Sequence, residues 1–360
     1  MTRRMQQAAT IRAVDLFCGA GGLTHGLEEA GIEVVFGVDV DPACKYPFEA
    51  NNRATFSLKA VEELTRSDFA DAFGGGEFTL LAGCAPCQPF STYSQGWSSP
   101  KDSRWNLLGC FGKLVEQTRP DLVTMENVPR LEKQDVFKDF VGVLLKAGYE
   151  VSHTVVNCAD YGLPQQRRRL VLLASKLGPI ELIKPTNQPD NYVTVRDAIE
   201  DLPPLDAGGV CKADPLHQAC SLSPLNLKRI RASKPGGTWR DWDESLVADC
   251  HKKKSGKTYP GVYGRMSWDE CAPTVTTQYY GFGNGRFGHP EQDRALSLRE
   301  GAILQSFPPD YQFVPDGAPI YRKSIGRLIG NAVPVKLGEA IGRSIVRHVA
   351  AFERKAKRAA

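Results

Sequence analysis

Short apolar runs separated by helical stretches dominate the first half of the chain. The runs occupy residues 13–17, 34–39, 80–82, 122–125 and 170–174. Apolar runs of this length predict buried β-strands. Between the first two, residues 23–30 have helical periodicity, which stops at Gly31. Strands separated by helices predict a parallel sheet with right-handed crossovers.

The pattern changes after about residue 184. Residues 185–319 are rich in proline, glycine and turn-forming pairs, and they contain few long periodic segments. This composition predicts a second, irregular domain made of strands and loops. Helical periodicity returns at residues 324–328 and again at 335–352. We therefore expect two domains, followed by a helical C-terminal segment.

The bulk composition is that of an ordinary globular protein. A chain of 360 residues can bury one large core and a smaller one. No apolar run approaches the ~20 residues that cross a bilayer, and the N-terminus lacks the apolar stretch of a secretory signal. The ten cysteines are scattered rather than densely spaced, so we expect a reduced, cytoplasmic environment and no membrane.

The charge balance is mildly basic, at +4. Its distribution is more informative, because basic residues cluster at 167–169, 228–231, 252–254 and 354–358. Such clusters can contact the phosphates of a nucleic acid. Each can equally be a solvated face of the protein.

Five short segments carry most of the candidate chemistry. They are DLFCGAGG at 15–22, GCAPCQPFS at 83–91, ENV at 126–128, QQRRR at 165–169 and GNAVP at 330–334. In this order and spacing they closely resemble the DNA (cytosine-5)-methyltransferase family. The resemblance runs from about residue 11 to about 345 and is weaker between about 190 and 260.

The resemblance implies an α/β fold with two parts. The first is a Rossmann-like S-adenosyl-L-methionine-dependent methyltransferase domain at residues 1–186. The second, at 187–320, is a smaller, irregular, β-rich domain that recognises the target sequence. Residues 321–360 are then expected to return to the catalytic domain.

The glycine turn at 19–22 follows a strand and opens a helix. Missing side chains let the backbone approach a ligand, and the helix N-terminus offers free N–H groups. Asp39 ends the second strand, where an acid commonly binds ribose hydroxyls. The same residues can also form an ordinary turn, and a glycine turn alone would suit a dinucleotide enzyme.

The resemblance implies that the ligand is S-adenosyl-L-methionine, with Phe17 near its sulfonium and Val40 on its adenine. The cofactor-contacting residues that we expect are Phe17, Gly19, Ala20, Gly21, Gly22, Asp39, Val40, Pro86, Leu107, Asn331 and Val333. An acid that often contacts adenine in the family is missing at Ala60, so no residue is assigned to that contact.

Cys87 is the candidate nucleophile. A thiolate that adds to C6 of cytosine makes C5 able to accept a methyl group, which divides one difficult step into easier ones. Pro86 stiffens the turn that aims the thiol. Cys84 and Cys87 could instead form a metal or redox pair, but no second CxxC lies nearby.

Glu126 and two arginines complete the predicted catalytic group. A carboxyl at Glu126 could stabilise the charge that develops at N3, although it could also be an ordinary acid at a helix start. Arg167 and Arg169 share a face if their segment is extended. The resemblance places Arg169 at O2 of the cytosine and Arg167 near a phosphate or Cys87. The alternative is a basic surface strand.

A cytosine inside a duplex must be flipped out of the stack before it can react. Residues 92–105 lack a regular pattern and could form a loop that closes over the base. The DNA-contacting residues that we expect are Ser91, Gln165, Thr274, Arg240 and Arg286. The cysteines and histidines of the irregular region fit no tight zinc-ligand spacing, so no metal is expected.

The favoured interpretation is a DNA cytosine-5 methyltransferase that acts on double-stranded DNA as a monomer. Its compact size resembles a bacterial or phage modification enzyme, with a restriction endonuclease as a separate partner and a location at the nucleoid. A tRNA cytosine-5 methyltransferase of the same fold and a non-catalytic DNA-binding relative remain alternatives. A nicotinamide oxidoreductase would leave Cys87 and Asn331 without a role.

Overall fold

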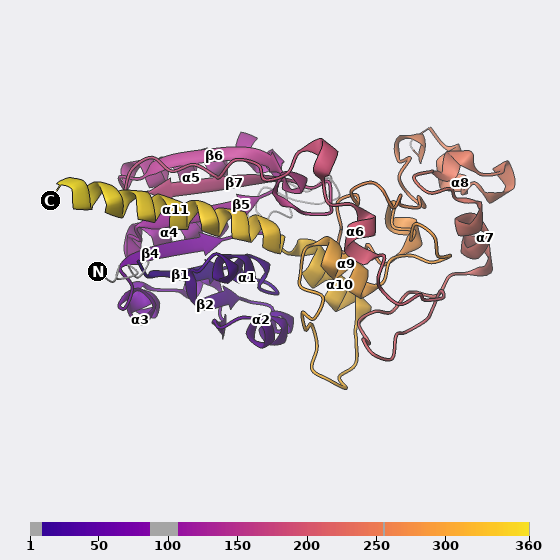
Figure 1. Ribbon diagram of the computed structural model, residues 1–360, viewed down its shortest axis with the longest axis horizontal. Helices are drawn as coiled ribbons and strands as arrows, with labels where there is room; N and C mark the ends of the chain where they lie inside the picture. Colours follow the sequence, from indigo (N-terminus) through magenta and orange to yellow (C-terminus); the bar gives the residue numbers. More distant parts are fainter. Residues whose placement is uncertain (1–8, 87–106, 255, 360) are drawn as a thin grey trace, which may run out of the picture. The chain divides into compact units, whose positions relative to one another are not determined.

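The computed structural model describes residues 9–86, 107–254 and 256–359 (Figure 1). The expected sites Cys87 and Ser91 and the loop at 92–105 lie outside these residues. Two compact units are present. The sheet unit contains the described residues up to Asn157, together with Arg168–Pro185 and the chain from Val333. The loop unit contains Cys158–Arg167 and Thr186–Ala332.

A seven-stranded sheet forms the centre of the sheet unit, in the order β3-β2-β1-β4-β5-β7-β6. The strands are β1 (Ile11–Leu16), β2 (Glu33–Asp39), β3 (Thr55–Leu58), β4 (Phe78–Gly83), β5 (Leu122–Asn127), β6 (Glu150–Asn157) and β7 (Arg168–Ser175). The predicted α/β class is confirmed. Strands β3 and β6 were not predicted, because β3 is short and β6 has few buried side chains.

The expectation of an all-parallel sheet is wrong at one edge. Strands β1 to β5 pair in parallel, but β7 runs antiparallel to both β5 and β6. Only residues 158–167 join β6 to β7. A parallel crossover needs a dozen or more residues, so this short connection returns the chain antiparallel.

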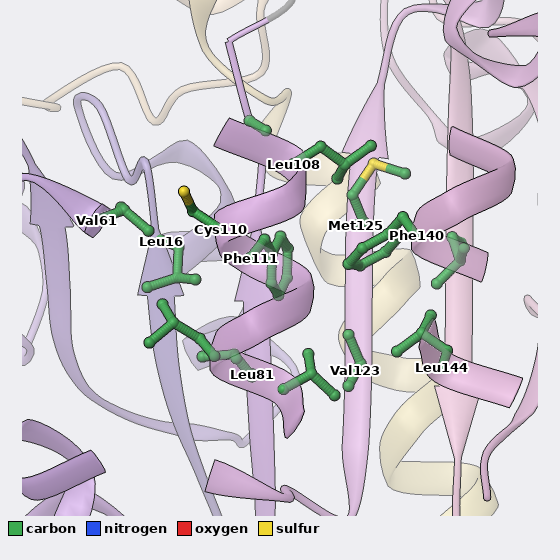
Figure 2. Close-up of a cluster of buried hydrophobic side chains, with 14 of the residues drawn as sticks. Leu16, Val61, Leu81, Leu108, Cys110, Phe111, Val123, Met125, Phe140 and Leu144 are labelled. Atoms are coloured by element: carbon green, nitrogen blue, oxygen red, sulfur yellow. The ribbon is translucent and has the colours of Figure 1, made fainter. Parts of the chain in front are cut away.

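Helices cover both faces of the sheet. They are α1 (Gly22–Glu29), α2 (Lys45–Asn51), α3 (Ala70–Phe73), α4 (Leu107–Thr118), α5 (Asp135–Lys146) and α11 (Val335–Ala359). Helix α1 packs along α11, and α4 packs on α5. Figure 2 shows α4 and α5 in front of the strands and the yellow α11 behind them. No helix of the described residues has the length and apolar character to cross a membrane.

The core between the sheet and α4 is aliphatic and aromatic. Leu16, Leu81 and Val123 come from three neighbouring strands and are at most 1% exposed. Phe111 of α4 and Phe140 of α5 meet above them with ring centroids 5.2 Å apart (Figure 2). Burying such side chains stabilises the fold by about 1.5–3 kcal/mol each. This core fixes the strand ends that carry the candidate site.

The order in which strands are added to the sheet reverses between β1 and β4. From β1 it proceeds through β2 to β3 on one side, whereas β4 and β5 lie on the other side. Ligands of open α/β sheets bind beyond the carboxyl ends of the strands at such a switch point. Leu16 pairs with Gly83 there, so the segments that follow both strands leave the sheet side by side.

The loop unit is irregular, as expected, but its described residues are not rich in strands. Its helices are α6 (Val195–Ile199), α7 (Pro224–Ala232), α8 (Asp249–Lys252), α9 (Leu298–Leu304) and α10 (Arg322–Asn331). Strand pairing in its described part is limited to isolated bridges. Frequent proline and glycine explain this, because proline cannot donate to a ladder and glycine weakens a strand.

A buried ion pair organises part of the loop unit. The Arg294 guanidinium donates to both carboxylate oxygens of Glu300, at 2.7 and 2.8 Å, and both side chains are buried. Burial raises the pKa of Glu300, but Arg294 and the neighbouring donors outweigh it and hold the pKa at about 2. Glu300 also caps α9 by accepting from the Ser297 amide. A single carboxylate therefore ties a helix start to the loop before it.

The contact between α1 and α11 depends on a glycine, and this gives a stability prediction. A Cβ at Gly26 would overlap the backbone of Val335 and Glu339. We expect Gly26→Ala to lower the free energy of unfolding by about 1–3 kcal/mol, because the two helices must separate. Urea unfolding measures the change.

Gly142→Ala is the matched control. A Cβ at Gly142, inside α5, would meet no atom of the described residues within 4 Å. Gly142→Ala should raise the free energy of unfolding by about 0.5–1 kcal/mol, because alanine loses less backbone entropy than glycine when a helix forms. Equal effects of the two substitutions would contradict the close packing of α1 on α11.

Candidate active site

The turn after β1 has a left-handed backbone at three places. Phe17 has φ 59°, Gly19 φ 55° and Gly21 φ 89°. Phe17 is not glycine, so its conformation stores strain on the order of 1–3 kcal/mol. The Cys18 amide donates to the Val38 carbonyl at 3.0 Å, which holds the turn against β2. The glycine turn is thus fixed by the protein itself, before any ligand is considered.

Asp39 is bound to the glycine turn. Its Oδ2 accepts from the Gly19 amide and its Oδ1 from the Asp41 amide, each at 3.0 Å. Burial raises the pKa of Asp39, although these two N–H donors oppose the shift. A carboxylate oxygen can accept more than one hydrogen bond. The structure therefore brings together the turn and the acid that the sequence predicted, in a form that could accept two hydroxyl groups.

Two large apolar side chains are exposed at neighbouring strand ends. Val40 follows β2 and is 65% exposed, and Leu58 ends β3 and is 57% exposed. Asp39 pairs with Leu58 in the sheet, so both side chains lie at the same edge. An acceptor carboxylate beside exposed apolar side chains fits a nucleoside. Sequence reasoning missed Leu58, because β3 was not recognised as a strand.

Asp15 is a buried acid beneath the same turn. It is 1% exposed, and its Oδ2 accepts from the Thr24 hydroxyl at 2.7 Å. Its Oδ1 has no hydrogen-bond partner among the described residues. Burial raises the pKa of Asp15 to about 7, against the Thr24 hydrogen bond. The hydrogen bond between Thr24 of α1 and Asp15 of β1 therefore involves a carboxyl group that can be neutral near physiological pH.

Glu126 lies at the end of β5, held by two side chains. Its carboxylate contacts Arg169 Nε at 2.8 Å through Oε1 and accepts from the Cys84 thiol at 3.0 Å through Oε2. The Glu126 side chain is 3% exposed, so this ion pair is largely shielded from water. The structure thus brings Glu126 and Arg169 together, as the sequence predicted. Cys84 is a partner that sequence reasoning did not identify.

A second polar contact fixes the segment that leads to Cys87. The side-chain amide of Asn127 donates through Nδ2 to the Ala85 carbonyl at 2.9 Å, and both residues are buried. Pro86, which follows, is exposed. The segment after β4 is therefore tied to the end of β5 one residue before the proline. Cys87 itself lies outside the described residues.

Gln165 and Arg167 lie in the loop unit, and both are buried. The Arg167 guanidinium donates to the Val275 carbonyl at 3.0 Å and to the Gly330 carbonyl at 3.1 Å. Gln165 was expected to contact DNA, yet it is fully buried and its amide is hydrogen-bonded inside the protein. Arg167 and Arg169 thus belong to different units rather than to one exposed strand face.

The other expected DNA contacts are accessible to different degrees. Thr274 is exposed, and its hydroxyl donates to the Gln166 carbonyl at 2.7 Å. Arg240 is exposed, with its guanidinium carbon 5.6 Å from the Trp239 ring centroid. Arg286 is half-buried and packs against Gly264.

The remaining cofactor candidates divide between the units. In the sheet unit, Ala20 and Gly22 are buried in the glycine turn, Leu107 is half-buried at the start of α4, and Val333 is buried. Asn331 is exposed at the end of α10, in the loop unit. No cluster of three or more His, Cys, Asp or Glu that could hold a metal occurs within the described part of the chain.

Comparison with known proteins gives a consistent result. Residues 11–347 match the model of the family described as C-5 cytosine-specific DNA methylase. The Type II methylase M.HgiDII of Herpetosiphon aurantiacus is 52% identical over 337 residues, which cover 93% of this chain and 94% of the relative. The Type II methyltransferase M.Sau96I of Staphylococcus aureus is 30% identical, with 94% and 76% covered.

Solved structures share the fold at low sequence identity. A protein described as a DNA modification methyltransferase encoded within an E. coli prophage matches with a TM-score of 0.73 at 21% identity, covering 95% of this chain and all of the other. The Dnmt2 methyltransferase of S. pombe matches with a TM-score of 0.61 at 16% identity, covering 95% and 99%.

Asp15 gives a prediction on stability and pH. Its pKa of about 7 lies above the ordinary 3.8, so the folded protein holds this proton more tightly than the unfolded chain. The contribution of Asp15 to stability therefore falls as pH rises from about 4 to about 7. Asp15→Asn keeps the acceptor for Thr24 but cannot ionise. Across that window, the free energy of unfolding of the variant should exceed that of the wild type by on the order of a few kcal/mol.

Urea unfolding at a series of pH values between about 4 and 9 measures this difference. It should grow with pH and become constant above about 7, because Asp15 is then fully ionised. A difference that does not change with pH would mean that Asp15 titrates in its ordinary range.

Proposed function

The chain belongs to the C-5 cytosine-specific DNA methylase family, and from that premise we propose how its own residues perform the reaction. The enzyme is a DNA (cytosine-5)-methyltransferase of the type II, restriction-modification class. The observation that most supports a working active site is the buried Glu126 carboxylate, which contacts both Arg169 and Cys84. Cys84 belongs to the described segment after β4 that ends at Pro86.

S-adenosyl-L-methionine is the proposed methyl donor, and the sheet unit fits it. Asp39 would accept hydrogen bonds from the ribose hydroxyls, and Val40 with Leu58 would contact the adenine. Phe17 and the turn Gly19, Ala20, Gly21 and Gly22 would face the methionine part. Pro86, Leu107, Asn331 and Val333 complete the proposed set. When bound, this donor supplies an electrophilic methyl group.

Cys87 is the proposed nucleophile. Its thiolate adds to C6 of the flipped cytosine, which forms a C–S bond and moves the ring's electron pair toward C5 and N3. Once C5 carries the methyl group, loss of the C5 proton returns an electron pair to the ring. The C–S bond then breaks and releases the Cys87 thiolate, so the nucleophile is regenerated.

Glu126 and Arg169 stabilise the charge that develops in the ring. A carboxyl group at N3 shares a proton with the nitrogen, and a guanidinium donates to O2. The contact between Arg169 Nε and Glu126 Oε1 supports this assignment, because it presets the relative position of the two groups. For Arg167 we propose an indirect role, because its guanidinium donates to internal carbonyls.

The loop unit is proposed to read the target sequence in duplex DNA. Exposed Thr274 would contact the backbone beside the flipped base, and Arg240 and Arg286 would contact bases or phosphates. Ser91, outside the described residues, is a further proposed contact. Direct DNA contact by Gln165 would require its buried side chain to leave the interior.

The biological setting is also a proposal. Relatives at 52% and 30% identity are named a type II methylase and a type II methyltransferase, which supports a separate restriction endonuclease that cuts the same site. We propose that the enzyme acts as a monomer on chromosomal DNA, in the cytoplasm at the nucleoid. Catalysis by one chain agrees with the presence of the donor-site and base-site residues in a single sequence.

Methylation in a cell tests the function. We expect bisulfite sequencing of DNA from a bacterial host without cytosine-5 methylation of its own to reveal protected cytosines in one short site. Cys87→Ser should lower the rate by roughly a thousandfold or more, because no C–S bond forms. Cys250→Ser makes the same change at an exposed cysteine of α8 and should remain active.

Two outcomes would contradict the proposal. Methylation by Cys87→Ser at a tenth of the wild-type rate would remove Cys87 from the role of nucleophile. Unmodified DNA together with methylated cytosine in tRNA would favour the tRNA-modifying alternative over the DNA enzyme.

Asp39→Ala tests the donor site. Losing hydrogen bonds to a charged acceptor costs about 1.5–3 kcal/mol each, so S-adenosyl-L-methionine should bind roughly 10- to 100-fold more weakly. Binding of DNA alone should change less, because Asp39 lies at the nucleoside end of the site. Calorimetry with each ligand measures both values, and an unchanged affinity for the donor would leave Asp39 as part of an ordinary turn.

A further inference from the structure

Three buried polar side chains form a connected group inside the loop unit. Gln165 and Gln305 are fully buried, and Arg167 is 2% exposed. Buried polar groups need hydrogen-bond partners, since an unsatisfied group costs about 1–3 kcal/mol. The partners of this group are mostly backbone atoms of other segments, so it determines where those segments lie.

The group holds both backbone groups of Val275. The Val275 amide donates to Gln165 Oε1 at 2.8 Å, and its carbonyl accepts from Arg167 at 3.0 Å. Side chains thus bind backbone groups that a strand partner would otherwise bind, in a unit whose described part has only isolated bridges. The residue before it, exposed Thr274, is the proposed DNA contact.

Gln305 connects this arrangement to helix α10. Its Nε2 donates to the Ile329 carbonyl at 2.8 Å, and its Oε1 accepts from Gln165 Nε2 at 2.9 Å. Ile329 lies in the last turn of α10, where carbonyls lack the usual i+4 partner, and its carbonyl also accepts from the Ala332 amide at 3.3 Å. Arg167 takes the next carbonyl, that of Gly330, and its positive charge suits a helix C-terminus.

The chemistry of these groups fixes the orientation of both amides. The Ile329 carbonyl can only accept, so Gln305 must turn its nitrogen toward it and its oxygen toward Gln165. Gln165 must then donate to Gln305, as it also does to the Leu304 carbonyl at 3.0 Å. Its oxygen is left to accept from Val275. The hydrogen-bond direction is therefore set from the end of α10 through to the residue beside Thr274.

Close backbone packing couples the position of the end of α10 to that of residues 276–277. A Cβ at Gly330 would lie 2.5 Å from backbone atoms of Thr276 and Thr277. The end of α10 and the 276–277 backbone are thus in direct contact, and Gln305 is hydrogen-bonded to one side of that contact. A change at Gln305 can shift the segment that carries Thr274 without touching the surface.

We infer that Gln305 is a positioning residue, which sets the place of Thr274 through Gln165 and the Val275 amide. The inference rests on the proposed contact of Thr274 with DNA. Gln305 itself is fully buried, so its effect on DNA must pass through this chain of hydrogen bonds.

A double-mutant cycle tests the inference. Gln305→Met keeps the length of the side chain but removes its donor and acceptor. We expect this variant to bind duplex DNA that contains the enzyme's target site about three- to tenfold more weakly than the wild type does. In a Thr274→Val background, the same change should have little further effect, because the contact that it misplaces is already absent.

Gln218→Met is the matched control. Gln218 is also buried in the loop unit, but among the described residues the partner of its Nε2 is local, the Pro215 carbonyl at 2.9 Å. This variant should lose thermal stability without losing DNA affinity. If Gln305→Met does not fold, Gln305→Asn, which retains the amide but is too short to reach both partners, enters the same cycle with the same expected result.

The results separate a positioning role from a structural one. A DNA affinity of Gln305→Met equal to that of Gln218→Met, or a full loss that persists in the Thr274→Val background, would overturn the inference. Amide hydrogen exchange gives a readout without DNA, because Val275 should lose protection in Gln305→Met and keep it in Gln218→Met. Unchanged exchange at Val275 would overturn the inference, whereas a wild type that binds no DNA would overturn only the proposed function.

Discussion

The parallel pairing of β1 with β4 is the constraint on which the candidate site depends. Leu16 and Gly83 are in register at the carboxyl ends of these strands, so the two segments that follow leave the sheet together. A Cβ at Gly83 would lie 3.0 Å from the Leu16 carbonyl and from the Phe111 ring, a tighter contact than a side chain normally makes. The close approach of β1, β4 and α4 thus places the glycine turn beside the segment that leads to Cys87.

Polar groups at this sheet edge are placed by burial as much as by contact. Asp39 is held by two backbone amides, and Glu126 lies between a guanidinium and a thiol. Burying a charge without partners would be costly, so each group has a restricted position. Asp15 shows the other outcome, because burial raises its pKa to about 7 and makes the neutral form accessible. Preorganised groups of this kind avoid reorganisation during a reaction.

The loop unit is stabilised by hydrogen bonds between side chains and backbone groups. Its described residues contain isolated bridges instead of ladders, so backbone groups must find side-chain partners. Arg294 with Glu300 fixes the start of α9, and Gln165, Arg167 and Gln305 fix Val275 and the end of α10. Side chains that bind particular backbone atoms can hold an irregular surface in one shape.

The sequence by itself determined the class of the fold and the type of chemistry. Apolar runs located five of the seven strands. The glycine turn, Asp39 and Glu126 were identified because each lies at or next to the end of such a run, whereas the role of Arg169 came from the family resemblance. Only the tertiary structure decided the antiparallel β7, the exposed Leu58, the Cys84 contact and the burial of Gln165 and Arg167. These features depend on partners far apart in sequence, such as Arg167 with Val275 and Gly330. Local pattern carries strand and turn signals, whereas pairing direction and burial are set by which distant segments meet.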